Sequence, residues 1–154
     1  MSLGIGAIAN KIREDEEFIV YEYGGYNLNN PIYTNDNRIM DGYITVCKSC
    51  FVEPEIHKKI KKRPSGRKVT VIKRVLKTVD YNSLIKEGNI VIVNCCNCWK
   101  TTDDGFDINA LSIIHKLFDT YQKEGVICNE IRFFKWNRNL SKIWQGIAGK
   151  EVYI

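Results

Sequence analysis

The sequence predicts an α+β domain, with a mostly antiparallel sheet, one long packed helix and two short helices. Short segments rich in β-branched and aromatic residues recur along the chain, and one segment, 108–123, has a helical apolar period. The order strand, strand, strand, short helix, strand, short helix, strand, long helix, strand is typical of this class. No internal repeat and no Pro/Gly-rich linker divides the chain, so we expect a single domain over residues 1–154.

Six segments are predicted to be strands. Residues 18–23 (FIVYEY) and 41–46 (DGYITV) have β-branched and aromatic composition, and 67–78 alternates valines with basic residues. The apolar run 89–94 (NIVIVN) is expected to be the most buried strand. The remaining two strands are expected at 3–9 and 126–136.

Three segments are predicted to be helices. Residues 53–62 have Pro54 in the first turn and isoleucines four apart, and "RPSG" follows them. Residues 80–88 begin at a capping Asp80 and end at Gly88. The long helix, 108–123, has Asp107 as its cap and Gly125 as its stop, with an apolar stripe of Ile108, Leu111, Ile114, Leu117, Phe118 and Tyr121.

Composition limits the class of protein. Hydrophobic residues make up 44% of the chain and charged residues 27%, which is typical of a globular protein rather than a disordered one. No apolar run reaches membrane-spanning length. The first residues lack the basic stretch that precedes the apolar part of a secretory signal. We therefore expect a cytoplasmic protein whose six cysteines are reduced.

Four of the cysteines form two Cys-x-x-Cys pairs, each at the end of a predicted strand. Cys47 and Cys50 make the first pair, and Cys95 and Cys98 the second. Four thiolates can hold one tetrahedral zinc ion, although the gap between the pairs is longer than in common zinc-binding motifs. Three interpretations stay open: a structural zinc site, small buried core residues, or a redox dithiol.

Basic residues are concentrated between residues 57 and 77, where ten lysines and arginines occur without an acid. Because the whole chain has a net charge of +5, this run leaves −5 for the remainder. Three interpretations stay open: a solvated face, a nucleic-acid contact, or a contact with an acidic protein. The residues singled out as partner contacts are Lys58, Lys61, Lys62, Arg63, Arg67 and Lys68.

A second candidate contact is the segment YEYGGYNLNNPIYTNDNR, residues 21–38. Tyrosine supplies stiff amphipathic area and asparagine adaptable hydrogen bonding, which is the composition of antibody contact loops. Tyr21 and Tyr23 share one strand face and are also suited to the core. The residues expected to contact a partner are Tyr26, Asn27, Asn29, Asn30, Tyr33 and Asn35.

The size of the chain, its expected cytosolic location, its bipolar charge and its Tyr/Asn-rich loop resemble those of small bacterial immunity proteins, which neutralise polymorphic or contact-dependent toxins. That resemblance implies a tight one-to-one complex with a toxin domain, often a nuclease, and it assigns no residue a role. No nucleotide-binding loop, H-E-x-x-H motif or nucleophile elbow is present. We therefore expect a non-enzymatic binding protein without a cofactor, or with one structural zinc. The first alternative is a zinc-stabilised nucleic-acid-binding protein that uses residues 57–77, and the second is an enzyme of unrecognised type.

Overall fold

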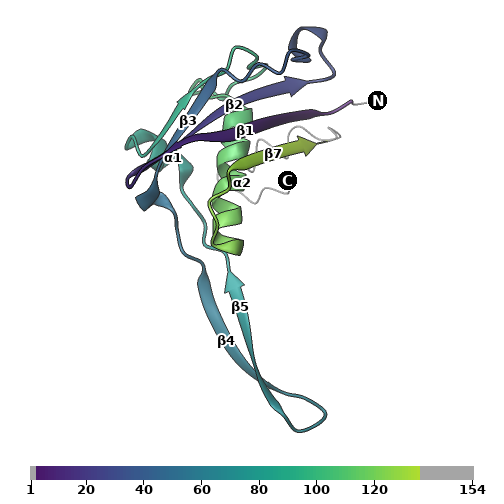
Figure 1. The fold of residues 1–154 in the computed structure, drawn as a ribbon, viewed down its shortest axis with the longest axis vertical. Coiled ribbons are helices and arrows are strands. Elements are labelled where there is room, and N and C mark those ends of the chain that lie inside the picture. The colour runs from purple at the N-terminus through teal and green to yellow at the C-terminus, as the bar shows by residue number, and fades with distance from the viewer. Residues whose placement is uncertain (1–2, 136–154) are drawn as a thin grey trace.

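The body of the protein is a five-stranded antiparallel sheet with two helices packed against it. The computed structural model describes residues 3–135. The strands are β1 (Ile5–Glu14), β2 (Phe18–Asn27), β3 (Gly42–Cys47), β6 (Ile90–Val93) and β7 (Glu130–Lys135). They lie in the order β6-β3-β2-β1-β7, and each neighbouring pair is antiparallel. Figure 1 shows the helix α2 (Ile108–Glu124) lying across this sheet.

Alternation along the strands gives the sheet one buried face. Successive side chains of a strand point to opposite faces, and alternate residues in parts of β1, β2 and β3 are buried, namely Ile5, Ala7, Ala9, Ile19, Tyr21, Tyr23, Ile44 and Val46. The α2 helix contacts β1 and β7, and its stripe residues Leu111, Ile114 and Phe118 are buried, as expected. The small side chains of Ala7 and Ala9 allow a helix to lie close to β1.

The helix α2 begins and ends at the residues that its sequence predicts. The Asp107 carboxylate accepts a hydrogen bond from the backbone N–H of Asn109 at 2.9 Å. Gly125 has φ +69° and donates its N–H to the Tyr121 carbonyl, which is the left-handed ending that glycine favours. The short helix α1 (Tyr81–Lys86) is also confirmed, with Asp80 capping it through the Ser83 N–H.

The second short helix, expected over 53–62, is wrong. Residues Glu55–Lys62 form strand β4, which pairs with β5 (Lys68–Val75) in a separate two-stranded sheet. A helix would place Lys58 beside Lys62, four residues along the same face, where like charges repel. In the hairpin every second residue of β4 can hydrogen-bond its backbone groups to β5, and neighbouring lysines point to opposite faces.

The expectation that residues 89–94 form the most buried strand is also wrong. Among residues 3–135, strand β6 lies at the edge of the sheet and pairs with β3 alone. Ile90 is buried, but Val91 and Val93 point away from the core and are about half exposed. The predicted α+β class, with a mostly antiparallel sheet and one long helix, is confirmed. Trp136 and the unassigned segment 137–154 lie outside the described residues.

An aromatic cluster joins α2 to the segments on either side of the hairpin. Phe118 stacks on Phe51 with ring centroids 4.8 Å apart and meets the Tyr81 ring edge-on at 5.5 Å. Phe51 precedes β4 and Tyr81 follows β5, so one α2 side chain holds both ends of the hairpin segment. Within residues 3–135, no helix is long and apolar enough to cross a membrane.

Truncating Phe118 should therefore destabilise the whole domain. We expect Phe118→Ala to lower the free energy of unfolding by about 3–5 kcal/mol, the usual range for a buried aromatic side chain. Val126→Ala, at a half-exposed loop position, should change it by less than about 0.5 kcal/mol. Urea unfolding followed by circular dichroism measures both, and equal effects of the two substitutions would contradict the packing role of Phe118.

Candidate partner-binding site

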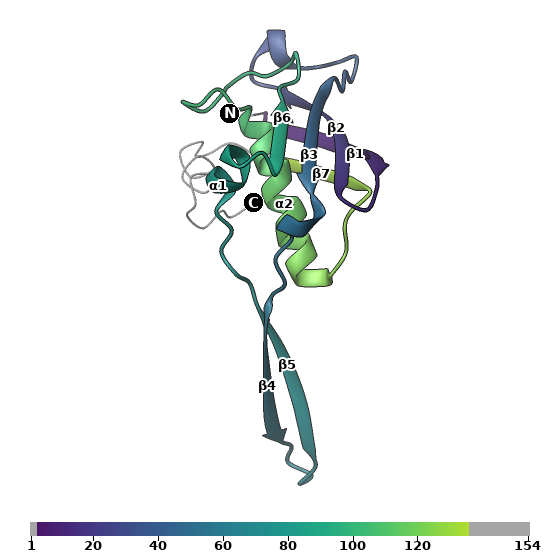
Figure 2. The same cartoon turned by 90° about the vertical axis from the view of Figure 1, so that its left-hand side faces the viewer.

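The β4–β5 hairpin projects from the body of the protein as an arm. Figures 1 and 2, two views at right angles, both show it extending beyond α2 and away from the five-stranded sheet. Its pairing runs without interruption from Glu55↔Val75 to Lys62↔Lys68. The tip is a tight turn of Pro64, Ser65 and Gly66, closed by the Arg63 backbone N–H, which donates to the Arg67 carbonyl at 2.9 Å. Gly66 has φ +83°, the left-handed conformation that such a three-residue turn requires.

The cations of the arm are exposed. Nine lysines and arginines and one glutamate lie between Glu55 and Val75, and every residue of this range except Val69 is exposed. Arg74 donates to the Lys123 carbonyl at 2.9 Å. The eight other cations form no ion pair within residues 3–135: Lys58, Lys59, Lys61, Lys62, Arg63, Arg67, Lys68 and Lys73. The expected contacts in this segment are therefore brought together on one arm.

The register divides the arm into two faces, because directly paired residues of an antiparallel ribbon point to the same side. We call the first the isoleucine face; it consists of Ile56, Lys58, Ile60, Lys62, Lys68, Thr70, Ile72 and Arg74. We call the second the valine face; it consists of Glu55, His57, Lys59, Lys61, Val69, Val71, Lys73 and Val75. The exposure of the three isoleucines was not expected from the sequence, because two of them were assigned to a helix. The signal for a hairpin was the Pro-Ser-Gly turn between two runs of equal length.

Hydrogen bonds from the end of α2 hold the base of the arm. The buried Gln122 accepts from the Lys77 N–H at 2.6 Å and donates to the Lys77 carbonyl at 2.9 Å. On the other strand's side, Tyr121 donates its hydroxyl to Glu53 at 2.5 Å. Since Glu53 precedes β4 and Lys77 follows β5, both strands leave the body from fixed positions. The arm is pre-positioned, although it has no core of its own.

Many side chains of the Tyr/Asn segment already make contacts within the protein. Tyr21 and Tyr23 are fully buried core residues. Asn27 accepts from the Asn29 N–H, Asn30 accepts from the Ile32 N–H, and Asn35 accepts from the Ile39 N–H while donating to the Gly25 and Ile39 carbonyls. Such contacts are Asx turns, which asparagine spacing in a loop can signal. These side-chain groups are therefore partly used before any partner arrives.

The remaining residues expected in this loop are also drawn into contacts. The Asn29 side chain accepts from the Leu3 N–H at 2.7 Å, and the Tyr33 carbonyl accepts from Asn97 at 3.0 Å. Tyr26 is partly buried against Phe134, with ring centroids 6.5 Å apart. This loop follows β2 at the end of the sheet opposite the arm (Figures 1 and 2). The two groups of expected partner contacts therefore do not form one continuous surface.

The two cysteine pairs lie at opposite ends of the β3–β6 strand pair. Cys47 donates its N–H to Asn89, just before β6, at 2.8 Å, whereas Cys96 donates its N–H to Asp41, just before β3, at 2.9 Å. The length of β3 separates these ends by roughly 20 Å, while sulfurs on one zinc ion lie within about 4 Å of each other. One zinc ion therefore cannot take Cys47, Cys50, Cys95 and Cys98 together in this fold. Within residues 3–135, no group of three or more His, Cys, Asp or Glu side chains is arranged to hold a metal ion.

The second cysteine pair belongs to a buried polar cluster at the start of α2. The Asp107 carboxylate accepts from the Tyr23 hydroxyl at 2.8 Å and from the Cys95 thiol at 3.4 Å. The Tyr23 oxygen in turn accepts from the Cys95 N–H at 3.0 Å. Burial, reinforced by the nearby Asp107 charge, raises the pKa of both Cys95 and Cys98 to about 12. Burial also raises the pKa of the Asp107 carboxyl, against the hydrogen bonds that it accepts. The cluster ties the segment between β6 and α2 to β2.

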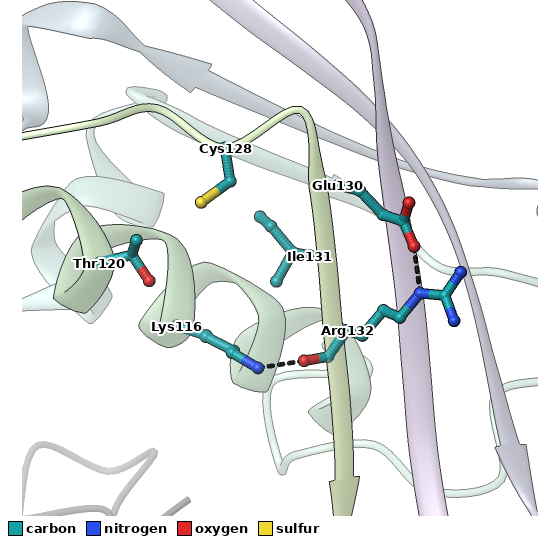
Figure 3. Close-up of a pocket in the computed structure, with 6 residues that line it drawn as sticks. All are labelled: Lys116, Thr120, Cys128, Glu130, Ile131 and Arg132. Carbon is teal, nitrogen blue, oxygen red and sulfur yellow. Dashed lines mark hydrogen bonds and ion pairs between the residues drawn. The ribbon is translucent and has the colours of Figure 1, made fainter. Parts of the chain in front are cut away.

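A separate hollow of about 380 Å³ lies between α2 and β7. Figure 3 shows its lining residues, Lys116, Thr120, Cys128, Glu130, Ile131 and Arg132. Lys116 donates to the Arg132 carbonyl of β7, and the Arg132 guanidinium pairs with Glu130. The charged groups of the hollow thus contact one another or the backbone.

Removing the Gln122 amide should loosen the base of the arm. Gln122→Met keeps the volume of the side chain but leaves the Lys77 N–H and C=O without their partner, which should cost about 1–3 kcal/mol of stability. Hydrogen exchange measured by mass spectrometry should be faster in residues 68–79. Lys123→Met, at the neighbouring exposed position, is the control. Unchanged exchange in Gln122→Met would show that these hydrogen bonds do not hold the arm.

The cysteines should differ strongly in reactivity, because the thiolate is the reacting form. Hydrogen bonds from Ser49 lower the pKa of Cys47, so iodoacetamide at pH 7.5 should modify Cys47 first and Cys95 last. Peptide mass spectrometry over time gives the order. Ser49→Ala should slow the modification of Cys47 and leave that of Cys96 unchanged. If Cys95 reacted as fast as Cys47, the buried polar cluster would not be closed in solution.

Comparison of the chain with protein-family models, with curated proteins and with solved structures finds no match.

Proposed function

We propose that this protein acts by binding rather than by catalysis, as a cytoplasmic inhibitor of the immunity type. Its β4–β5 arm binds an acidic face of a partner protein. The observation that carries this proposal is the set of eight exposed cations on the arm without an ion-pair partner among residues 3–135. A solvated face would need no arm, whereas an extended ribbon presents its charge where another molecule can reach both sides.

The dimensions of the arm suit an inhibitor. Strands of eight residues each give a ribbon roughly 27 Å long, which can enter a cleft on a partner. Its base is fixed by Gln122 and Tyr121, so less orientational freedom is lost on binding than with a mobile loop. Preorganisation of this kind improves affinity by lowering the cost of association.

The charge distribution supports an oriented encounter. The arm has a net charge of +8, which leaves −3 for the rest of the chain, since the total is +5. A bipolar protein turns its positive end toward an acidic surface before contact, and such steering raises the association rate. The Tyr/Asn loop lies at the other end of the molecule, so Tyr26 and Tyr33 have no part in this contact.

Nucleic acid is the second candidate partner, because a two-stranded β-ribbon fits the major groove of a duplex. The arm has no aromatic side chain on which single-stranded bases could stack. The zinc-stabilised form of this alternative loses its support, since the four cysteines do not converge.

Neutralising the tip of the arm should weaken binding mainly through slower association. We expect the triple variant Lys62→Gln, Arg63→Gln, Arg67→Gln to associate with its protein partner at least about tenfold more slowly at low salt, with a smaller change in dissociation. The control triple Arg13→Gln, Arg38→Gln, Lys86→Gln removes the same charge from the body and should have little effect. The partner is captured from a lysate of the source cells, and the rates are measured with the purified complex.

The salt dependence of the affinity distinguishes a protein partner from a nucleic-acid partner. Nucleic acid contacted at six or more phosphates would lose roughly a thousandfold in affinity between 50 and 200 mM salt, and nuclease treatment would abolish capture. A protein complex should survive nuclease and lose far less. If nucleic acid alone is retained, or if the tip variant binds as fast as the wild type, the proposed function is wrong.

A further inference from the structure

The two faces of the arm differ in what they expose. On the isoleucine face, Ile56, Ile60 and Ile72 have exposed fractions of 56%, 72% and 61%. On the valine face, Val71 and Val75 are exposed by 39% and 36%, and Val69 is only partly exposed. The isoleucine face also has four cations and no acid, whereas the valine face includes Glu55. The larger apolar surface and the unopposed positive charge therefore coincide on one side.

Isoleucine and lysine alternate along β4 on this face, in the order Ile56, Lys58, Ile60, Lys62. Across the ribbon Ile56 is paired with Arg74 and Lys58 with Ile72. Ile72 is thus the diagonal neighbour of Ile56 and Ile60, within about 8 Å of each. The three isoleucines therefore lie close together, with positive charges around them. An apolar centre with a charged rim is the usual arrangement of a protein–protein interface.

We infer that the isoleucine face is the surface of the arm that becomes buried in the complex, and that it fits a protein surface on which acidic and apolar side chains alternate. This inference rests on the proposed function and adds which face binds and what chemistry the partner offers. The cations attract the acidic partner electrostatically, and the isoleucine side chains are desolvated on contact. The valine face stays turned toward solvent.

Charge and chemistry disfavour the other occupants. A second copy of this chain, paired arm to arm, would bring two arms of net charge +8 together. Residues 136–154 contain three lysines and arginines and one glutamate, so their charge does not complement the face either. A nucleic-acid backbone offers phosphates to the lysines but no apolar surface to cover three isoleucines set among them. A protein with both acidic and apolar side chains satisfies both parts of the face.

The probes are two peptides and a duplex, each measured against the full-length protein by calorimetry. One peptide of about twelve residues alternates Glu with Val, and the second alternates Glu with Ser at the same length and charge, so that any difference between them reports the apolar contact alone. The third probe is a DNA duplex of about 16 base pairs. We expect the Glu/Val peptide to bind at least about tenfold more tightly than the Glu/Ser peptide, and the duplex to bind less tightly than the Glu/Val peptide.

Two matched variants test which face of the arm binds the partner. The first replaces Ile56, Ile60 and Ile72 by Thr, and the second replaces Val69, Val71 and Val75 by Thr. Threonine keeps the β-branch that favours a strand, and neither variant alters charge. The first should bind the Glu/Val peptide about 30-fold less tightly, the loss typical of one interface hot spot, while the second should bind within about threefold of the wild type. An unchanged melting temperature of the body confirms that both variants fold.

The remaining outcomes contradict either the inference about the isoleucine face or the proposed function. If the valine variant alone loses the Glu/Val preference, or if neither variant does, the inference fails, although binding through the cations can still hold. Two triple variants test the cations. One carries Lys58→Gln, Lys62→Gln and Lys68→Gln on the isoleucine face, and the other carries Lys59→Gln, Lys61→Gln and Lys73→Gln on the valine face. If neither triple variant weakens peptide binding, the proposed function itself fails. If the duplex binds more tightly than either peptide, with a steep loss in salt, the partner is nucleic acid and both statements are wrong.

Discussion

The ring of Phe118 is the contact on which the rest of the structure depends. It lies at the centre of an aromatic cluster that includes Phe51, which leads into β4, and Tyr81, which follows β5. The same helix turn supplies Gln122, whose amide binds both backbone groups of Lys77. A projecting hairpin buries almost nothing of its own, and an isolated two-stranded hairpin is only marginally stable. The end of α2 therefore supplies the rigidity that the arm lacks.

The body and the arm differ in how they combine apolar and charged residues. The body buries a core of aliphatic and aromatic side chains between one sheet face and α2, although several aliphatic residues of its loops and outer strands are exposed. The arm combines a net charge of +8 with three exposed isoleucines that lie close together. The β-branch of isoleucine favours a strand, but threonine would supply it with less exposed apolar surface, and grouped apolar side chains on a surface typically mark interaction sites. Charge alone would suit many polyanions. The isoleucines narrow the choice to a partner that also offers apolar surface.

Polar residues that suggested chemistry or recognition serve the body instead. Cys95 and Tyr23 bind Asp107 at the start of α2, and this buried cluster fixes the long segment between β6 and the helix. The asparagines of the Tyr/Asn loop close turns on their own backbone. The buried cluster pairs polar atoms that would be costly to leave unpaired in the core. The nine cations of the arm, by contrast, form no ion pair within residues 3–135.

The sequence by itself determined α2 with both of its caps, the strands of the sheet and the uneven charge, because each depends on local periodicity, capping chemistry or composition. It did not determine β4, since Ile56 and Ile60 fit a helix as well as a strand until pairing with β5 decides. Nor could Cys-x-x-Cys spacing show that the two pairs sit at opposite ends of antiparallel strands. The exposed position of β6 follows from strand order rather than from hydrophobicity. Tertiary structure decided these points because pairing, register and burial are set by residues distant in the chain.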